Sequence, residues 1–149
     1  MPLREAFSSN VAKFLPALRP RSAPRVLPTA GFDEVPPDQL VEEETMPEYR
    51  VDHFYPVHLG EVFHDRYQVL AKLVYGSSST IWLARDLQNH QYVALKVYIH
   101  NSARHRELPF YQHLATLPSS MHPGAKNIRQ LLDSFQVAGP HGTHMVLVM

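Results

Sequence analysis

A lysine inside an apolar, strand-like run is the feature that most constrains the fold of this chain. Lys96 lies within the run Val-Ala-Leu-Lys-Val-Tyr-Ile at residues 93–99, and it follows Gly76 by 20 residues. Strands normally keep lysine on their solvated face, because desolvating an ammonium group costs far more than burying a methyl group. A small-residue turn followed by a strand with one inward lysine suggests a phosphate site, in which backbone covers the phosphates and the lysine reaches them. The alternative is a hairpin whose lysine extends into solvent, and the spacing alone leaves both interpretations open.

The composition fits one globular domain preceded by a tail. The chain has 149 residues, of which 44% are hydrophobic and 19% charged, and it has no cysteine. Disulfides and thiolate metal sites are therefore excluded. No apolar run approaches the length of a membrane span, and the net charge of zero gives little support to nucleic-acid binding. The ten histidines are scattered, and His141 and His144 flank a turn with no carboxylate nearby, so no metal site is expected.

Residues 1–48 are predicted to be a disordered tail in which the charges are segregated. Eight of the 13 prolines precede Tyr49, and residues 33–52 carry eight acidic side chains against one basic. Proline at this density removes backbone donors and blocks helix formation. Residues 1–20 have apolar side chains at helical spacing with basic ones among them, which suits either a mitochondrial presequence or a disordered leader. The acidic block is most simply a solvated linker, although it could dock on a basic surface.

From Tyr67 onward the pattern predicts a small antiparallel sheet. Alternating apolar residues over 67–73 and apolar runs over 81–84 and 92–99 indicate three strands separated by turns at Gly76 and at 86–90. Residues 104–117 then change to helical spacing. Ser102 is a plausible cap, but Pro109 is tolerated only in a first turn, so the helix may instead begin nearer Arg106. Residues 131–137 and 143–149 flank a turn-rich connection. The prediction is an α+β fold, with a sheet of five strands and one helix after the third.

Glu107 is a candidate partner for the lysine. It follows Lys96 by 11 residues and lies in the first turn of the predicted helix. If that helix packs beside the third strand, the carboxylate would hold the ammonium group in place and keep it charged. The alternative is an exposed glutamate near a helix N-terminus, which is favourable in any case through the helix dipole.

These features together resemble the N-terminal lobe of a eukaryotic protein kinase, and in detail the fungal-type members of the SR-protein kinase branch. The resemblance covers a lead-in segment at residues 49–66 and the lobe itself at 67–149. Its motifs are Tyr55-Pro56, Gly60-Glu61, Arg66-Tyr67, Ser79-Thr80-Ile81-Trp82-Leu83, Arg106-Glu107-Leu108, Leu131-Leu132-Asp133-Ser134-Phe135 and Gly139-Pro140-His141-Gly142. Because several distinct motifs agree in order and spacing, the match is specific.

The resemblance implies an ATP-binding lobe of a serine/threonine protein kinase. Lys96 would contact the α- and β-phosphates, and Glu107 would orient it as the other half of a supporting catalytic pair. Ala94 would pack on the adenine, and Met149 would lie at or next to the gatekeeper position. The full set implied to contact the nucleotide is Leu73, Val74, Tyr75, Gly76, Ser77, Ser78, Ser79, Thr80, Ile81, Ala94, Lys96 and Met149. The implied partners are ATP, with Mg²⁺ in the complete domain, and an SR-type protein substrate, with neither nucleic acid nor membrane. The implied location is cytoplasmic or nuclear, or mitochondrial if the leader is a presequence.

The sequence departs from the family pattern in ways that bear on function. Val74 stands where the loop's first glycine is expected, and Ser78 replaces an aromatic residue at the loop tip, so nucleotide affinity could be reduced. Neither a His-Arg-Asp catalytic loop nor an Asp-Phe-Gly segment occurs in the 149 residues. We therefore expect a truncated kinase domain that lacks magnesium ligands and is inactive alone. The alternatives are a non-catalytic module that binds a nucleotide, or a protein partner through an exposed lobe face, and a β-rich interaction domain.

Overall fold

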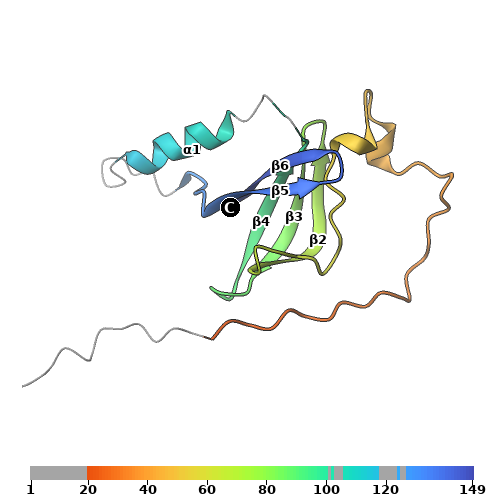
Figure 1. The fold of residues 1–149 in the computed structure, drawn as a ribbon, viewed down its shortest axis with the longest axis horizontal. Coiled ribbons are helices and arrows are strands. Elements are labelled where there is room, and N and C mark those ends of the chain that lie inside the picture. Colours follow the sequence, from red (N-terminus) through yellow and green to blue (C-terminus); the bar gives the residue numbers. More distant parts are fainter. Residues whose placement is uncertain (1–19, 101, 103–105, 118–123, 125–126) are drawn as a thin grey trace, which may run out of the picture.

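The fold is a curled antiparallel sheet with one helix beside it. The computed structural model describes residues 20–100, 102, 106–117, 124 and 127–149. Its elements are two short 3-10 helices, η1 (Glu42–Thr45) and η2 (Val51–His53), the helix α1 (Glu107–Thr116), and the strands β1 (Val62–Phe63), β2 (Tyr67–Gly76), β3 (Ser79–Asp86), β4 (Gln91–Tyr98), β5 (Asp133–Gly139) and β6 (Gly142–Val148) (Figure 1). Within the described ranges, no helix is long and apolar enough to cross a membrane.

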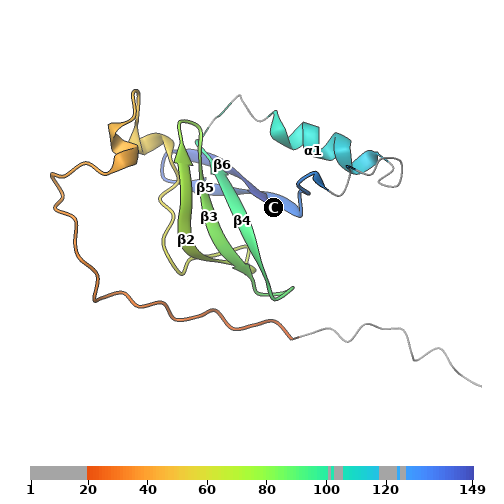
Figure 2. The same ribbon diagram turned by 180° about the vertical axis from the view of Figure 1, so that it is seen from behind.

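The sheet has six strands in the order β1-β2-β3-β4-β6-β5, and every neighbouring pair is antiparallel. The five predicted strands and the helix after the third of them are confirmed. The additional strand is β1, a two-residue piece of the lead-in segment that pairs with the start of β2. Figure 2 shows, from behind, that β2, β3 and β4 run side by side and that α1 lies at the end of the molecule away from η1 and η2.

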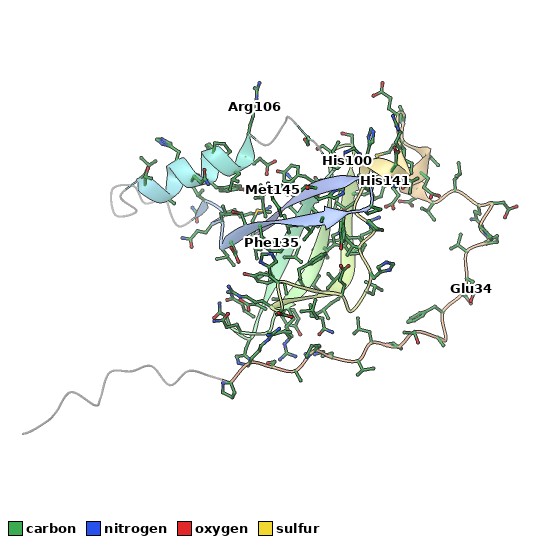
Figure 3. All side chains as sticks on the ribbon, viewed as in Figure 1. Glu34, His100, Arg106, Phe135, His141 and Met145 are labelled. Carbon is green, nitrogen blue, oxygen red and sulfur yellow. The ribbon has the colours of Figure 1, made fainter. Side chains whose placement is uncertain are left out.

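The two faces of the sheet have different neighbours. Cross-strand partners share a face, so Trp82 opposite Leu95 and Ala84 opposite Val93 define what we call the core face. The buried cluster on that side is formed by Phe63, Tyr67, Val69, Trp82, Ala84, Val93, Leu95, Val97, Phe135, Val146 and Val148, with Phe135 coming from the edge strand β5 (Figure 3). The other face, defined by Ile81, Leu83 and Lys96, we call the helix face. The main core therefore lies against Trp82 rather than against Ile81.

Strand β2 breaks the simple alternation that the sequence predicts. Its register against β3 shifts between Val69 and Ala71 and again between Lys72 and Val74. Tyr67 and Val69 are fully buried, whereas Leu73 is 51% exposed. The prediction that Leu73 continues a half-buried stripe is therefore wrong, because each bulge resets which face the following residue occupies.

A buried carboxylate ties the ends of the strands together. Asp86, at the end of β3, accepts two hydrogen bonds from the Arg66 guanidinium at 3.0 and 2.8 Å and two from the backbone N–H groups of Gln88 and Asn89. Desolvation raises the pKa of Asp86, but the hydrogen bonds from Arg66 and the backbone outweigh it and hold the pKa below its ordinary value. The ionised carboxylate therefore stabilises the fold at neutral pH, and that contribution is lost in acid.

The described part of the tail is extended and touches the sheet. Gln68, which is buried in β2, accepts a hydrogen bond from the backbone N–H of Arg25 at 2.8 Å and donates one to its carbonyl at 2.7 Å. The N–H of Ser22 donates to the carbonyl of Leu87 at 2.8 Å. The presequence hypothesis concerns residues 1–20 and falls almost wholly outside the described residues.

The helix begins where proline permits. Glu107 is its first residue, and Pro109 lies in the first turn, where its missing N–H has no partner to lose. Arg106 holds the N-cap position, so of the two starts that the sequence left open, at Ser102 or nearer Arg106, the structure has the second. No residue of α1 is buried, so its attachment to the sheet depends on side chains at its N-terminal end.

We predict that Asp86→Ala lowers the free energy of unfolding by about 3 kcal/mol, because it leaves a guanidinium and two backbone N–H groups without their acceptor. Urea denaturation followed by circular dichroism measures the loss. The matched control is Asp52→Ala, which removes an exposed ion pair with Arg50 and should cost much less stability than Asp86→Ala. Equal losses in the two variants would show that Asp86 is not an anchor.

Candidate functional site

The centre of the candidate site is an ion pair between β4 and α1. Lys96 Nζ donates to Glu107 Oε1 at 2.5 Å. The lysine side chain is 17% exposed and the glutamate side chain 44% exposed, so the ammonium is largely shielded while the carboxylate keeps part of its solvation. The structure thus brings together the two residues that the sequence singled out for a supporting pair. The pair fixes the Lys96 ammonium on the helix face. Its contact with Glu107 leaves part of the ammonium group open to another partner.

Tyr98 is a third member that the sequence analysis missed. Two positions after Lys96 in β4, it lies on the same face, and Lys96 Nζ is 5.0 Å from the centre of its ring. Besides burial, the Glu107 carboxylate raises the pKa of the Tyr98 hydroxyl. Glu107 therefore acts on two side chains of the same strand. The signal in the sequence was the i, i+2 spacing of Lys96 and Tyr98, which places both on one face.

The electrostatics of the pair follow from these contacts. Desolvation raises the pKa of Glu107, but hydrogen bonds from Lys96 and Tyr98 and the charges of Lys96 and Arg129 lower it further than burial raises it, leaving a net decrease. Desolvation and the hydrogen bond to Glu107 both raise the pKa of the Tyr98 hydroxyl. At neutral pH the site therefore holds an ionised glutamate and a neutral tyrosine.

An apolar surface continues from the lysine across the helix face. Ile81 lies opposite Lys96, Val74 opposite Ile81, and Ala94 opposite Leu83. The N–H of Ala94 donates to the carbonyl of Met149 at 2.7 Å, and the N–H of Met149 donates back at 3.0 Å. The structure therefore groups five of the predicted nucleotide contacts on one face, namely Val74, Ile81, Ala94, Lys96 and Met149. The hairpin turn at Ser77 and Ser78, between β2 and β3, adjoins them.

Other predicted contacts point elsewhere. Tyr75 and Thr80 are cross-strand partners on the core face, and Thr80 Oγ1 accepts a hydrogen bond from Trp82 Nε1 at 2.9 Å. Their side chains cannot reach a ligand on the helix face, so only their backbone could contribute. Leu73 lies in the second bulge and is exposed. Gly76 is not crowded, because a Cβ at this position would meet only the Ser79 carbonyl oxygen, at 3.7 Å.

Among the described histidines, His144 is the buried one and serves packing. His144 is fully buried, and its Nδ1 lies 2.9 Å from the Tyr98 carbonyl oxygen, which makes it the donor to that oxygen. Desolvation lowers the pKa of His144, and the neighbouring His100 lowers it further. Among the described residues, no group of three or more histidine, cysteine, aspartate or glutamate side chains could hold a metal ion.

The chain is similar to curated protein kinases over most of its length. It is 42% identical over 127 residues to a serine/threonine protein kinase of Aspergillus fumigatus, a match that covers 85% of this chain and 32% of that protein. It is 36% identical over 115 residues to the SRSF protein kinase 3 of Homo sapiens, which covers 72% of this chain and 20% of that protein. The serine/threonine-protein kinase SKY1 of Saccharomyces cerevisiae is also 36% identical over 115 residues, covering 71% and 15% of the two chains.

The chain thus spans about a third or less of the length of these relatives. No protein-family model matches it. A solved kinase domain superimposes on 64% of the chain, with a TM-score of 0.49 and 18% sequence identity.

We predict that Lys96→Met raises the pKa of Glu107, because desolvation of the carboxylate then has less to oppose it. In the wild type the pKa lies below its ordinary value of 4.5, so the ion pair stabilises the fold above that pH and loses its effect as pH falls through the lowered pKa. A ¹³C NMR titration of the glutamate carboxyl carbons measures the shift, with the Glu107 signal assigned by Glu107→Gln. An unchanged pKa in Lys96→Met would mean that the pair does not persist in solution.

Proposed function

We propose that the sheet and helix of this chain form an ATP-binding lobe. The premise is that the chain belongs to the SR-protein kinase branch of the serine/threonine protein kinases, over the stretch that it shares with its relatives. The observation that carries the proposal is the fixed ammonium of Lys96, held by Glu107 at 2.5 Å beside an apolar face. A shielded cation next to an apolar surface suits a ligand that has both a phosphate chain and an aromatic base.

The residues of the helix face fit the two ends of such a ligand. Ala94 and Met149 are paired neighbours on this face, and the short side chain of Ala94 would let a flat base lie against it, while Val74 and Ile81 offer apolar contact from the hairpin. At the other end, Lys96 would meet phosphate oxygens, and the backbone N–H groups of the Ser77–Ser78 turn lie at the hairpin tip, where they could cover the phosphates. When bound, ATP supplies the phosphoryl group that a kinase transfers.

Glu107 and Tyr98 act on the lysine and not on the ligand. A lysine has a long flexible side chain, and holding it in one position reduces the entropy that a phosphate contact would otherwise cost. Among the described residues no group of three or more histidine, cysteine, aspartate or glutamate side chains could hold a metal ion, so we assign Mg²⁺ no ligand among them and derive no step that depends on it.

In a protein as long as the curated relatives, we propose that this lobe serves phosphoryl transfer from ATP to serine or threonine of protein substrates, with SR-type proteins as the substrate class. The support is similarity to proteins named as serine/threonine kinases and as an SRSF protein kinase. The second candidate is a non-catalytic module that binds the nucleotide alone. It is favoured by Val74, whose β-branched side chain faces the ligand side of the hairpin where the family has glycine.

We predict that the 149-residue chain binds ATP and that Lys96→Met weakens binding at least about tenfold, the value of a charge-assisted hydrogen bond. Isothermal titration calorimetry with ATP measures the dissociation constants. Lys96→Arg tests the same point without leaving Glu107 unpaired, because it keeps the charge but changes its shape and reach. The matched control is Lys13→Met, the same change near the N-terminus, which should leave affinity unaltered.

Two outcomes would overturn the proposal. The first is that saturating ATP gives no binding to a wild-type chain whose circular dichroism shows a folded sheet. The second is equal affinity for ATP in the wild type and in both Lys96 variants. Transfer of phosphate to an arginine-serine peptide by the chain extended to the length of its relatives then separates the kinase from the non-catalytic module.

A further inference from the structure

The acidic part of the tail docks on the sheet, directly behind the hairpin that would cover the phosphates. Residues 42–57, which we call the docked segment, contain η1 and η2 and lie against the core face of β2 and β3. Figures 1 and 2 both show η1 and η2 beside the β2–β3 hairpin, at the end of the molecule away from α1. Of the two earlier hypotheses for this acidic block, a solvated linker or a docked element, the structure has the second.

The principal contact of the docked segment is an ion pair. Lys72 of β2 donates to Glu43 of η1, and the two side chains are only 31% and 22% exposed. The Lys72 ammonium also lies 5.4 Å from the ring centre of Trp82 and 5.9 Å from that of Tyr75. A cation placed over two aromatic rings and bonded to a carboxylate is held in one position. By comparison, the Arg50–Asp52 pair is a local contact between exposed side chains.

A second contact reaches the hairpin nearer its tip. The Tyr75 hydroxyl donates to Glu42 Oε2 at 3.4 Å. Desolvation and the neighbouring carboxylates of Glu42 and Glu43 raise the pKa of Tyr75, so the hydroxyl stays protonated as a donor at neutral pH. Lys72 and Tyr75 flank the second bulge of β2, and Gly76 follows immediately. The docked segment therefore binds β2 at the end of the strand that leads into the turn.

Aromatic side chains line the space between the segment and the strands. A cavity of about 220 Å³ is lined by Glu43, Met46, Tyr49, Val51, Phe54, Tyr55, Pro56, Val57, Lys72, Tyr75, Thr80 and Trp82. The rings of Tyr49 and Phe54 stack with their centres 5.4 Å apart, and Tyr55 and Val57 pack on the core. The segment is thus held by packing along its later half and by charge at η1.

These contacts lie on one face of the hairpin, and the candidate nucleotide surface lies on the other. We propose that Glu43, acting through Lys72, is a positioning residue that holds the β2–β3 hairpin in the conformation that covers the phosphates, an inference that rests on the proposed ATP-binding function. The turn Gly76-Ser77-Ser78-Ser79 has small side chains and no aromatic anchor at its tip, so ordering it costs conformational entropy. Contacts of the docked segment with the core face of the hairpin order this turn in advance, so less conformational entropy is lost when the ligand binds.

The test uses the only tryptophan of the chain. Trp82 belongs to β3 and lines the cavity beside the docked segment, so its emission reports whether the segment is in place without any nucleotide. We expect Glu43→Gln to shift the Trp82 emission to longer wavelength and to raise the ATP dissociation constant two- to fivefold, the scale of a partly exposed ion pair. The matched control is Glu34→Gln, the same change on the exposed extended stretch (Figure 3), which should alter neither signal.

Two further measurements distinguish positioning by charge from a general loss of structure. In a double-mutant cycle with Lys72→Gln, adding Glu43→Gln should have no further effect on ATP affinity, because the two residues act as one pair. In about 1 M salt, where the screening length is only about 3 Å, the affinities of wild type and Glu43→Gln should converge. Additive effects that persist in high salt would overturn the role of the pair.

The outcomes also separate this inference from the function on which it rests. If wild type binds ATP and Glu43→Gln shifts the Trp82 emission without changing the dissociation constant, the segment docks but does not position the hairpin, and the inference fails while ATP binding stands. If the emission of Glu43→Gln equals that of wild type, Glu43 does not hold the segment, and the inference fails as well. If wild type does not bind ATP, the proposed function fails, whatever the emission shows.

Discussion

The two-residue period of a β-strand decides where the functional side chains of this protein lie. In β4, Leu95 and Val97 enter the core, and the same period sends Lys96 and Tyr98 to the opposite face. There they meet Glu107, so the only charged residue of the strand is kept out of the apolar cluster and is given a partner. A shift of one residue in the register of β4 would bury the ammonium among valines and turn three core residues, Val93, Leu95 and Val97, toward the ligand side.

The bulges of β2 likewise decide which side chains of the hairpin lie on each face of the sheet. Because the register shifts between Lys72 and Val74, two residues that would otherwise share a face are sent to opposite sides. The side chain of Lys72 lies on the core face and contacts the docked segment. The side chain of Val74 lies on the helix face, on the same side of the sheet as Lys96. The hairpin thus has an anchored side and a ligand side, each built from neighbouring residues of the same strand. The helix contributes differently, since α1 buries none of its residues and is fastened to β4 by a carboxylate at its first position.

Much of this arrangement was predictable from the sequence, and the exceptions have physical reasons. The antiparallel sheet, the helix after its third long strand and the start of that helix near Arg106 followed from periodicity and from what Pro109 permits. Tyr98 was missed because a tyrosine in an apolar strand is expected to be a core residue, and its hydroxyl acquires a partner only once α1 is placed. The docking of Glu43 was left as one of two options, because an ion pair between residues 29 positions apart depends on tertiary structure. The bulges have no local signal, since neither glycine nor proline marks them.

The bond between Gln68 and Arg25 has a consequence for how the tail can vary. Gln68 binds the backbone N–H and carbonyl of Arg25, so this contact recognises a peptide group, while the Arg25 guanidinium separately donates to the Tyr92 hydroxyl at 3.3 Å. Any residue that keeps an extended path and retains its N–H could occupy position 25, and proline alone would remove one of the two hydrogen bonds. The side chain at position 25 is therefore free to change without breaking the two bonds to Gln68. The residue that is constrained is Gln68. Its replacement by asparagine would move the side-chain amide away from the backbone of Arg25 and lose both hydrogen bonds.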